Sequence, residues 1–188
     1  MKCLRALFYF INEMKRVIWL ILLLSSCVSN HHKTWRNDFN AEEKKLMKLS
    51  RELISRAYFG TLVTVNEKGE LRTRIMEPLA PDSTFTVYMA TNKNSRKVKE
   101  IKNNPRATLF YFDRSAPGYV SLYGHAYIIS DRKTLDRYWQ KAWEQHYPGR
   151  KNYVLIRFIP NRLEMIYPAK NLPGDSLTWK PYEVILRN

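Results

Sequence analysis

The chain has 188 residues, 45% of them hydrophobic, so it is long enough to bury the core of one domain and too apolar to be disordered. Its two cysteines are Cys3 and Cys27, and the lack of any later thiol excludes a disulfide framework, a zinc-thiolate site and a cysteine nucleophile from the main domain. The formal charge of +15 attracts phosphate ligands, polyanions or anionic lipid headgroups, and charge alone does not choose among them.

The N-terminal residues have the organisation of a secretory signal. Lys15 and Arg16 precede an apolar run at 17–24, which is too short to span a bilayer because spanning takes about 20 apolar residues. The tetrapeptide Leu-Ser-Ser-Cys at 24–27 resembles the bacterial lipobox, in which the cysteine is acylated and becomes the mature N-terminus. We therefore expect Cys27 to be lipidated and to anchor the protein to a membrane of the bacterial cell envelope. A buried helix or an uncleaved anchor is the alternative interpretation.

These features divide the chain into three parts. Residues 1–27 are predicted to be the signal peptide, and Met14 is an alternative start that would make 1–13 an over-extended reading frame. The polar stretch 28–39 is predicted to be a tether, and 40–188 to be the folded domain.

The folded domain is predicted to open with a helix over 41–56. Asn40 and Glu43 have the spacing of a capping box, in which each side chain accepts a hydrogen bond from the other residue's backbone N–H. Four apolar residues follow at helical spacing: Leu46, Leu49, Leu53 and Ile54.

The remainder is predicted to be mostly β. The expected strands are 59–65, 71–76, 84–90, 106–112, 119–130, 153–159 and 163–167, with hairpin turns at 66–69 and 160–162 and an edge strand in the tail. The expected helices are 95–103, ended by Asn104-Pro105, and 134–143, with Asp131 as a cap. This set predicts a mostly antiparallel β-barrel of six or seven strands with two or three helices.

The strand predicted at 119–130 has two different faces. One face is aliphatic and comprises Val120, Leu122, Gly124, Ala126 and Ile128. The other face is polar and aromatic and comprises Tyr119, Ser121, Tyr123, His125 and Tyr127. Because side chains alternate along a strand, we expect the first face in the core and the second against a ligand or a partner subunit.

The segment from Thr91 to Lys97 leaves a strand through a polar loop and enters a helix. Ser95 can cap that helix, whose first amides favour an anion. Arg96 offers a planar fork for phosphate, and Lys97 offers a compact charge. Arg72 and Arg74 lie on one face of the strand at 71–76. An ordinary capped surface helix beside exposed arginines is the alternative.

Together these pieces resemble the pyridoxamine 5′-phosphate oxidase-like flavoproteins, and most closely the general-stress-protein branch of that superfamily. The resemblance runs from about Tyr58 to Ile166. Its parts, in order, are Arg74-Ile75-Met76, Ala90-Thr91-Asn92, Ser95-Arg96-Lys97, Asn103-Asn104-Pro105-Arg106, Tyr119-Val120-Ser121-Leu122-Tyr123-Gly124 and Lys141-Ala142-Trp143. No single part is decisive, and their order and spacing carry the resemblance.

The resemblance implies an FMN-binding split β-barrel that forms a homodimer with FMN at the subunit interface. Arg74, Arg96 and Lys97 would hold the phosphate, with Ser95 assisting. The isoalloxazine ring would lie along the backbone of Ile75, Met76, Ala90 and Thr91. Tyr119 stands where the family often places a flavin contact, and Trp143 is either a ring neighbour from the second subunit or a core tryptophan.

Two departures from the true oxidases concern the vitamin substrate. Leu79 occupies the position of a lysine that follows the strand arginine by five residues, and no Arg-x-His pair follows Leu163-Glu164-Met165. We therefore expect a flavin site without the pyridoxamine phosphate site.

Three functions remain open for this chain. The first is an envelope-anchored FMN-dependent oxidoreductase of unknown substrate, in which the flavin carries the redox chemistry and no catalytic residue is assigned. The second is a non-catalytic flavin- or haem-binding module for storage or sensing. The third is a polyanion binder, although the expected export and the lack of interleaved aromatic and basic residues argue against nucleic acid. The four histidines show no metal-ligand spacing, so we expect no metal.

Overall fold

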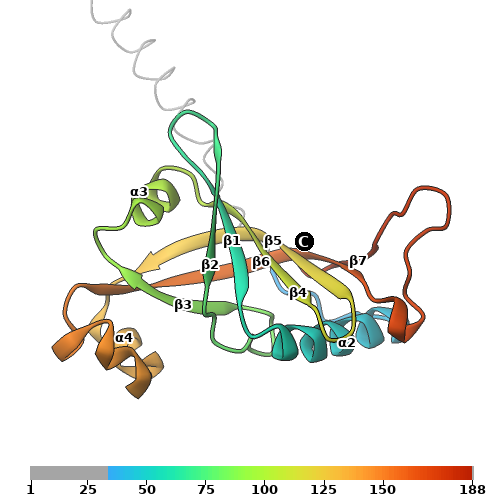
Figure 1. Cartoon of the computed structure of the whole chain (residues 1–188), viewed down its shortest axis with the longest axis horizontal. Helices are drawn as coiled ribbons and strands as arrows, with labels where there is room; N and C mark the ends of the chain where they lie inside the picture. Colours follow the sequence, from blue (N-terminus) through green and yellow to red (C-terminus); the bar gives the residue numbers. More distant parts are fainter. Residues whose placement is uncertain (1–33, 188) are drawn as a thin grey trace, which may run out of the picture. The chain divides into compact units, whose positions relative to one another are not determined.

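A computed structural model of the chain describes residues 34–187, so the predicted signal peptide and Cys27 lie outside the described residues. The described part is a curled antiparallel sheet with three α-helices around it (Figure 1). None of the helices in this part is long and apolar enough to cross a membrane.

Seven strands form the sheet. Their bounds are β1 Gly60–Val65, β2 Leu71–Met76, β3 Val87–Asn92, β4 Arg106–Asp113, β5 Gly118–Ile129, β6 Tyr153–Ile166 and β7 Tyr182–Ile185. The hydrogen-bonded order is β2-β1-β4-β5-β6-β3, and β7 also pairs with β6. The two ends of this path, β2 and β3, are not paired with each other in the described residues. The barrel therefore stays split, and the predicted fold class is confirmed.

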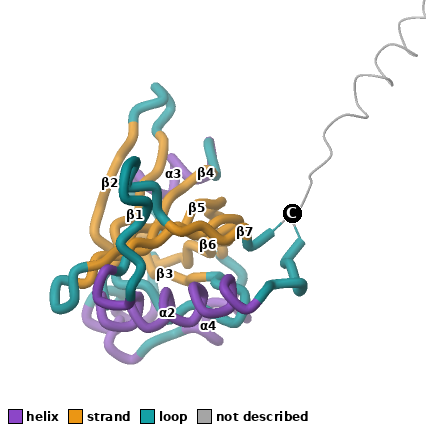
Figure 2. The backbone as a smooth tube through the Cα atoms, turned by 90° about the vertical axis from the view of Figure 1, so that its right-hand side faces the viewer, coloured by secondary structure: helices purple, strands orange, loops and turns teal. Residues whose placement is uncertain are grey.

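Helix α2 (Ala41–Ala57) begins where the capping pattern places it. The Glu43 N–H donates to Asn40 Oδ1 at 2.9 Å and the Asn40 N–H donates to Glu43 Oε2 at 2.9 Å, which confirms the capping box. Leu53 and Ile54, on its predicted apolar face, are buried. The helix runs beneath the strands in both views (Figures 1 and 2) and closes one side of the core.

The two faces of β5 are used as predicted for the core. Val120, Leu122 and Ala126 are fully buried in the core cluster that also contains the apolar side chains of α2. The side chains of Tyr119 and Tyr123 alternate with them on the opposite face and are only half-buried. This opposite face, which continues across the neighbouring strands, is called the outer face below.

The predicted hairpin across 160–162 is wrong, because β6 runs through this stretch as one strand. Gly124 lies opposite Pro160 and Tyr123 lies opposite Arg162, so Asn161 forms a bulge. Proline lacks an N–H for the ladder, and the bulge accommodates it there. A Cβ at position 124 would lie 2.1 Å from the Ile159 carbonyl oxygen, so the close approach requires glycine.

The stretch 160–162 also binds the C-terminal tail through hydrogen bonds. The Asn161 carbonyl oxygen accepts hydrogen bonds from the N–H groups of Leu186 at 2.8 Å and Arg187 at 3.2 Å. β7 pairs with β6 at Arg162–Met165, directly after Asn161, and is the predicted edge strand.

Other boundaries shift for local reasons. The predicted helix 134–143 is α4 (Arg132–Tyr138) followed by a separate 3₁₀ turn, and the Asp131 side chain caps α4 by accepting from Thr134 N–H at 2.9 Å. The strand expected at 84–90 begins only at Val87, because Phe85 has φ 58° and lies in a tight loop. The remaining short elements are α3 Arg96–Asn103, η1 Lys141–Gln145, η2 Pro148–Arg150 and η3 Pro168–Lys170.

The folded domain extends before the expected boundary at residue 40. Trp35 forms a β-bridge with Arg187, and Phe39 is buried in the core. Part of the stretch predicted to be a polar tether therefore packs on the domain.

Candidate functional site

The split of the barrel brings together residues that the sequence predicted to hold a phosphate. Arg74 on β2 reaches across to Glu100 on α3, where its Nη2 donates to Glu100 Oε2 at 2.7 Å. Because α3 follows directly after β3, this contact joins the two unpaired ends of the sheet. Arg74, Arg96 and Lys97 thus share one region.

Arg74 is held by a buried hydrogen-bond triangle. Its Nη1 donates to Thr64 Oγ1, and Thr64 Oγ1 donates to Glu100 Oε2 at 2.6 Å. The side chains of Arg74 and Glu100 are 19% and 10% exposed, and Thr64 is fully buried. These bonds leave other N–H groups of the guanidinium for an additional acceptor.

The side chains of Lys97 and Ser95 both contact the Thr91 hydroxyl. The Lys97 ammonium donates to Thr91 Oγ1 at 3.1 Å, and the hydroxyl oxygens of Thr91 and Ser95 are 3.3 Å apart. Ser95 occupies the N-cap position of α3, yet its side chain makes no capping hydrogen bond, so the predicted side-chain cap is wrong. The hydroxyl instead adds a donor beside the Lys97 charge.

The charges of the cluster are unbalanced. Burial lowers the pKa of Lys97, and the positive charges of Arg74 and Arg96 lower it further against the opposing effect of Glu100. Burial would raise the pKa of Glu100, but hydrogen bonds from Thr64 and Arg74 outweigh it and lower that pKa. Three cations therefore surround one carboxylate, and an anion would relieve their mutual repulsion.

Arg96 is exposed and faces a hollow of about 180 Å³ beside this cluster. Arg72 and Lys99 line the same hollow, but Arg72 pairs with Glu70 at 2.7 Å and Lys99 pairs with Glu67 at 3.0 Å. Among the described residues, Arg96 has no carboxylate within ion-pair distance. It is therefore the basic residue of this hollow best placed to receive a ligand anion.

The residues predicted to follow a flavin ring lie on the two edge strands. Ile75 on β2 is 66% exposed, and Met76 beside it is buried. Ala90 and Thr91 lie near the end of β3, and Thr91 is the residue that accepts the hydrogen bond from Lys97. The Tyr88 carbonyl on this edge accepts from the Leu79 N–H at 2.8 Å, which ties the loop after β2 to β3.

Tyr119 and Trp143 do not join the cluster in one chain. Register places Arg74, Leu62, Leu109 and Leu122 on one face of the sheet, and Tyr119 is three residues from Leu122 on the outer face. Burial raises the pKa of Tyr119, and the negative charge of Glu164 raises it further.

Trp143 is only 6% exposed and packs in a second core with Leu135, Tyr153 and Leu155, as expected for a core tryptophan.

Glu100 and Thr64 are the site residues that sequence reasoning missed. Glu100 is the one acidic residue of α3 and stands four positions after Arg96, and Thr64 is a polar residue at an inward position of β1. Both are polar residues at core-facing positions, which is the signal that could have indicated them.

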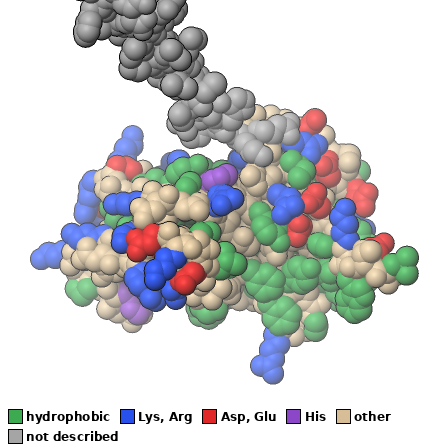
Figure 3. All heavy atoms as spheres, turned by 90° about the horizontal axis from the view of Figure 1, so that it is seen from above, with side chains coloured by type: hydrophobic (Ala, Val, Ile, Leu, Met, Phe, Trp, Pro, Cys, Tyr) green, Lys and Arg blue, Asp and Glu red, His purple; other side chains and the backbone are tan. Residues whose placement is uncertain are grey.

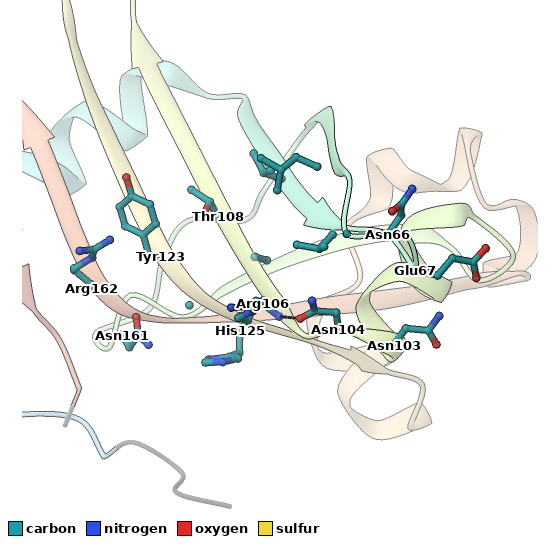
Figure 4. Close-up of a pocket in the computed structure, with 16 residues that line it drawn as sticks. Asn66, Glu67, Asn103, Asn104, Arg106, Thr108, Tyr123, His125, Asn161 and Arg162 are labelled. Atoms are coloured by element: carbon teal, nitrogen blue, oxygen red, sulfur yellow. Dashed lines mark hydrogen bonds between the residues drawn. The ribbon is translucent and has the colours of Figure 1, made fainter.

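A larger open groove of about 1000 Å³ lies on the outer face, between the β1–β2 hairpin and β6 (Figure 4). Tyr123 and Arg162 stand on one side of it, with the guanidinium 4.3 Å from the ring centroid, and Asn66 and Glu67 stand on the other. None of the residues predicted to bind flavin lines this groove.

On the face seen in Figure 3, acidic side chains lie among the basic ones, which is unlike a continuous surface for a polyanion.

Within residues 34–187 there is no group of three His, Cys, Asp or Glu side chains that could hold a metal ion.

Comparison with known proteins defines the class of this split barrel. A family model described as "Pyridoxamine 5'-phosphate oxidase like" matches residues 44–164. The chain therefore belongs to the pyridoxamine 5′-phosphate oxidase-like family.

Particular relatives lie in the general stress protein branch. General stress protein 26 of Bacillus subtilis (strain 168) is 29% identical over 119 residues, which cover 61% of this chain and 83% of the relative. The crystal structure of general stress protein 26 from Bacillus anthracis str. Sterne matches with a TM-score of 0.59 and 23% identity over 75% of this chain and 98% of that one.

A third match is a pyridoxamine 5′-phosphate oxidase-related, FMN binding protein from Nostoc punctiforme PCC 73102. Its structure has a TM-score of 0.56 and 13% identity over 80% of this chain and 99% of that one. At these identities the structural matches confirm the fold.

Proposed function

We propose that this protein binds FMN at the split of its barrel, with the phosphate held by Arg74, Arg96 and Lys97 and with Ser95 assisting. The observation that carries the proposal is the cluster of three cations around one buried carboxylate. The FMN binding of the Nostoc protein with the same fold supports the same cofactor here.

A phosphate monoester suits this cluster by charge. It carries about −1.5 to −2 near neutral pH, which offsets the surplus positive charge and moves the pKa of Lys97 back toward its ordinary value. The Arg74 guanidinium is already oriented by Thr64 and Glu100, so little side-chain entropy is lost on binding. The backbone of Ile75, Met76, Ala90 and Thr91 would then lie along the isoalloxazine ring.

The bound FMN would supply hydride or electron transfer, so we propose an oxidoreductase of the cell envelope. Its substrate differs from that of the vitamin oxidases. Leu79 packs its half-buried side chain against the second core, and a leucine offers a substrate phosphate neither charge nor a hydrogen bond. We expect no useful turnover of pyridoxamine phosphate.

We further propose that two copies pair through the outer face. Phe112 and Ile75 lie on this face and are 53% and 66% exposed, and Phe112 lies opposite the half-buried Tyr119. An apolar sheet face of this kind is typical of a partner surface. In such a homodimer Tyr119 would reach the flavin of the other copy, since it cannot reach the cluster of its own chain.

The proposed lipid anchor at Cys27 rests on the leader sequence alone. It would hold the domain at a membrane through the residues between Cys27 and Trp35.

The test is a titration of the flavin-free protein with FMN and with riboflavin, which lacks the phosphate. Arg96→Ala should weaken FMN roughly 10- to 150-fold, since a charge-assisted contact contributes about 1.5–3 kcal/mol. Riboflavin should change little. Lys99→Ala is the matched control, because Lys99 lines the same hollow and is paired with Glu67.

Equal losses for both ligands would contradict the phosphate assignment. The absorption spectrum of the purified protein tests the cofactor itself, because a haem spectrum instead of a flavin spectrum overturns the proposal. If neither nicotinamide nor quinol donors reduce the bound FMN, the protein is a flavin-binding module and not an oxidoreductase.

A further inference from the structure

A pocket of about 350 Å³ lies between the last turns of α2 and the loop that follows β2. Its wall is mainly apolar and includes Ile54, Pro78 and Leu79. The volume is near the lower end of the roughly 300–1,000 Å³ that small-molecule sites occupy. None of the cluster residues Arg74, Arg96 or Lys97 lines it, so the pocket is separate from the proposed phosphate site.

Tyr111 lines this pocket and carries an unused hydrogen-bond donor. The residue is 1% exposed, and its hydroxyl has no hydrogen-bond partner in the part of the chain that the structure describes. Burial raises the pKa of Tyr111 far above its ordinary value, so the hydroxyl stays protonated. Buried polar groups nearly always have a partner, and one that has none calls for an explanation such as a ligand.

Arg51 gives the same pocket a cation without a counter-ion. Its Nη1 donates to the Pro81 carbonyl at 3.1 Å, its Nη2 donates to the Ser83 carbonyl at 2.9 Å, and the guanidinium lies 4.0 Å from the Phe85 ring centroid. Among residues 34–187 no carboxylate lies within ion-pair distance of Arg51. Burial lowers the pKa of Arg51, and the more distant charge of Asp82 only partly offsets this.

We propose that this pocket binds a small apolar carboxylic acid, such as an aromatic or cyclic monoacid, with its carboxylate toward Arg51 and Tyr111. A carboxylate can accept from both donors, and the apolar body would contact Ile54, Pro78 and Leu79. A neutral hydrocarbon would leave the Tyr111 hydroxyl without a partner and the Arg51 charge without a counter-ion, and a dianion would meet only one cation.

The test uses the full-length protein in detergent micelles, titrated by calorimetry with 1-naphthoate and with its neutral analogue 1-naphthalenemethanol. We expect 1-naphthoate to bind at least about tenfold more tightly than the alcohol. Tyr111→Phe should weaken 1-naphthoate roughly tenfold and leave the alcohol unchanged.

Tyr111→Phe should also raise the melting temperature of the ligand-free protein, because it removes a buried hydroxyl that has no partner. The weaker binding therefore cannot come from misfolding. Tyr58→Phe is the matched control, since Tyr58 lines the same pocket but its hydroxyl already donates to Glu77.

Three results would overturn the proposal. They are no binding of 1-naphthoate at millimolar concentration, equal affinity for the acid and the alcohol, and unchanged 1-naphthoate binding in Tyr111→Phe. FMN affinity should be the same in all these variants, so failure here is distinguishable from failure of the proposed flavin site.

Discussion

Glu100 is the residue whose removal tests both the stability of the fold and the phosphate site. In Glu100→Gln the Arg74 guanidinium loses its buried counter-ion, which lies at 2.7 Å. Removing one partner of a fully buried pair costs about 3–5 kcal/mol. Arg74 is 19% exposed and keeps the Thr64 oxygen, so we expect a smaller loss, about 2–3 kcal/mol.

For a chain of this size each kcal/mol shifts the melting temperature by about 2–4 °C, so the flavin-free variant should melt about 4–12 °C below the parent protein. The phosphate of FMN would replace the lost counter-ion beside Arg74. Saturating FMN should therefore reduce the difference in melting temperature between variant and parent, whereas riboflavin should leave that difference unchanged. Scanning fluorimetry of both proteins without ligand, with riboflavin and with FMN measures these differences.

The control is Glu67→Gln, which breaks an ion pair of similar length between side chains that are 61% and 71% exposed. Exposed pairs contribute about 0–1 kcal/mol, so this variant should melt close to the parent protein. If FMN and riboflavin reduce the difference in melting temperature between Glu100→Gln and the parent protein equally, the phosphate does not lie beside Arg74 and the proposed site is refuted.

Three other expectations follow from the structure. The pKa of Asp113 is lowered from 3.8 to about 2 by hydrogen bonds from the Ser115 hydroxyl and from Arg56, so its stabilising contribution is complete above pH 3.8 and is lost as the pH falls toward 2. Asp113→Asn should flatten the curve of stability against pH between about pH 3.8 and 2. An unchanged slope there would show that Asp113 does not make this contribution. Phe112→Lys should shift the protein to monomer in sedimentation, whereas Leu177→Lys, exposed on the loop before β7, should leave the oligomeric state unchanged. Cys27→Ala should release the protein from membranes on fractionation, and equal retention of both forms would rule out the anchor.

Local signals predicted the elements whose ends are fixed by neighbouring residues. Asn40 with Glu43, and Asp131 with Thr134, make the caps that the sequence indicates, because these hydrogen bonds span only three residues. The alternation along 119–130 predicted the core face of β5 for the same reason.

The errors arise where a distant residue decides the local conformation. Pro160-Asn161-Arg162 is typical of a turn, yet Gly124 on β5 lets the backbone pass closely and turns the same residues into a bulge. Ser95 has the right identity for a cap, but its hydroxyl lies by Thr91. A single sequence does not show that Gly124 approaches residues 160–162 or that the Ser95 hydroxyl lies beside Thr91.

Glu100 shows why the site itself was only half visible from sequence. The basic residues could be recognised in order along the chain, since phosphate chemistry favours arginine and lysine near a helix N-terminus. Their counter-ion could not be recognised, because Glu100 becomes the partner of Arg74 only when β2 and α3 meet across the split of the barrel. The charge balance of the cluster, and therefore its expected response to a phosphate, is a property of the fold.

The same separation bears on the proposed oligomer. The cluster faces the inside of the split and Tyr119 stands on the outer face of β5, so within one chain they lie on opposite faces of the sheet. If both contribute to one flavin site, as the family resemblance implies, that site must be shared by two copies. Phe112→Lys then has a second consequence. Since it alters the proposed interface and none of the phosphate residues, it should weaken riboflavin and FMN by the same factor, whereas Arg96→Ala should affect FMN alone. A monomeric Phe112→Lys protein with unchanged affinity for both ligands would place the whole flavin site within one chain.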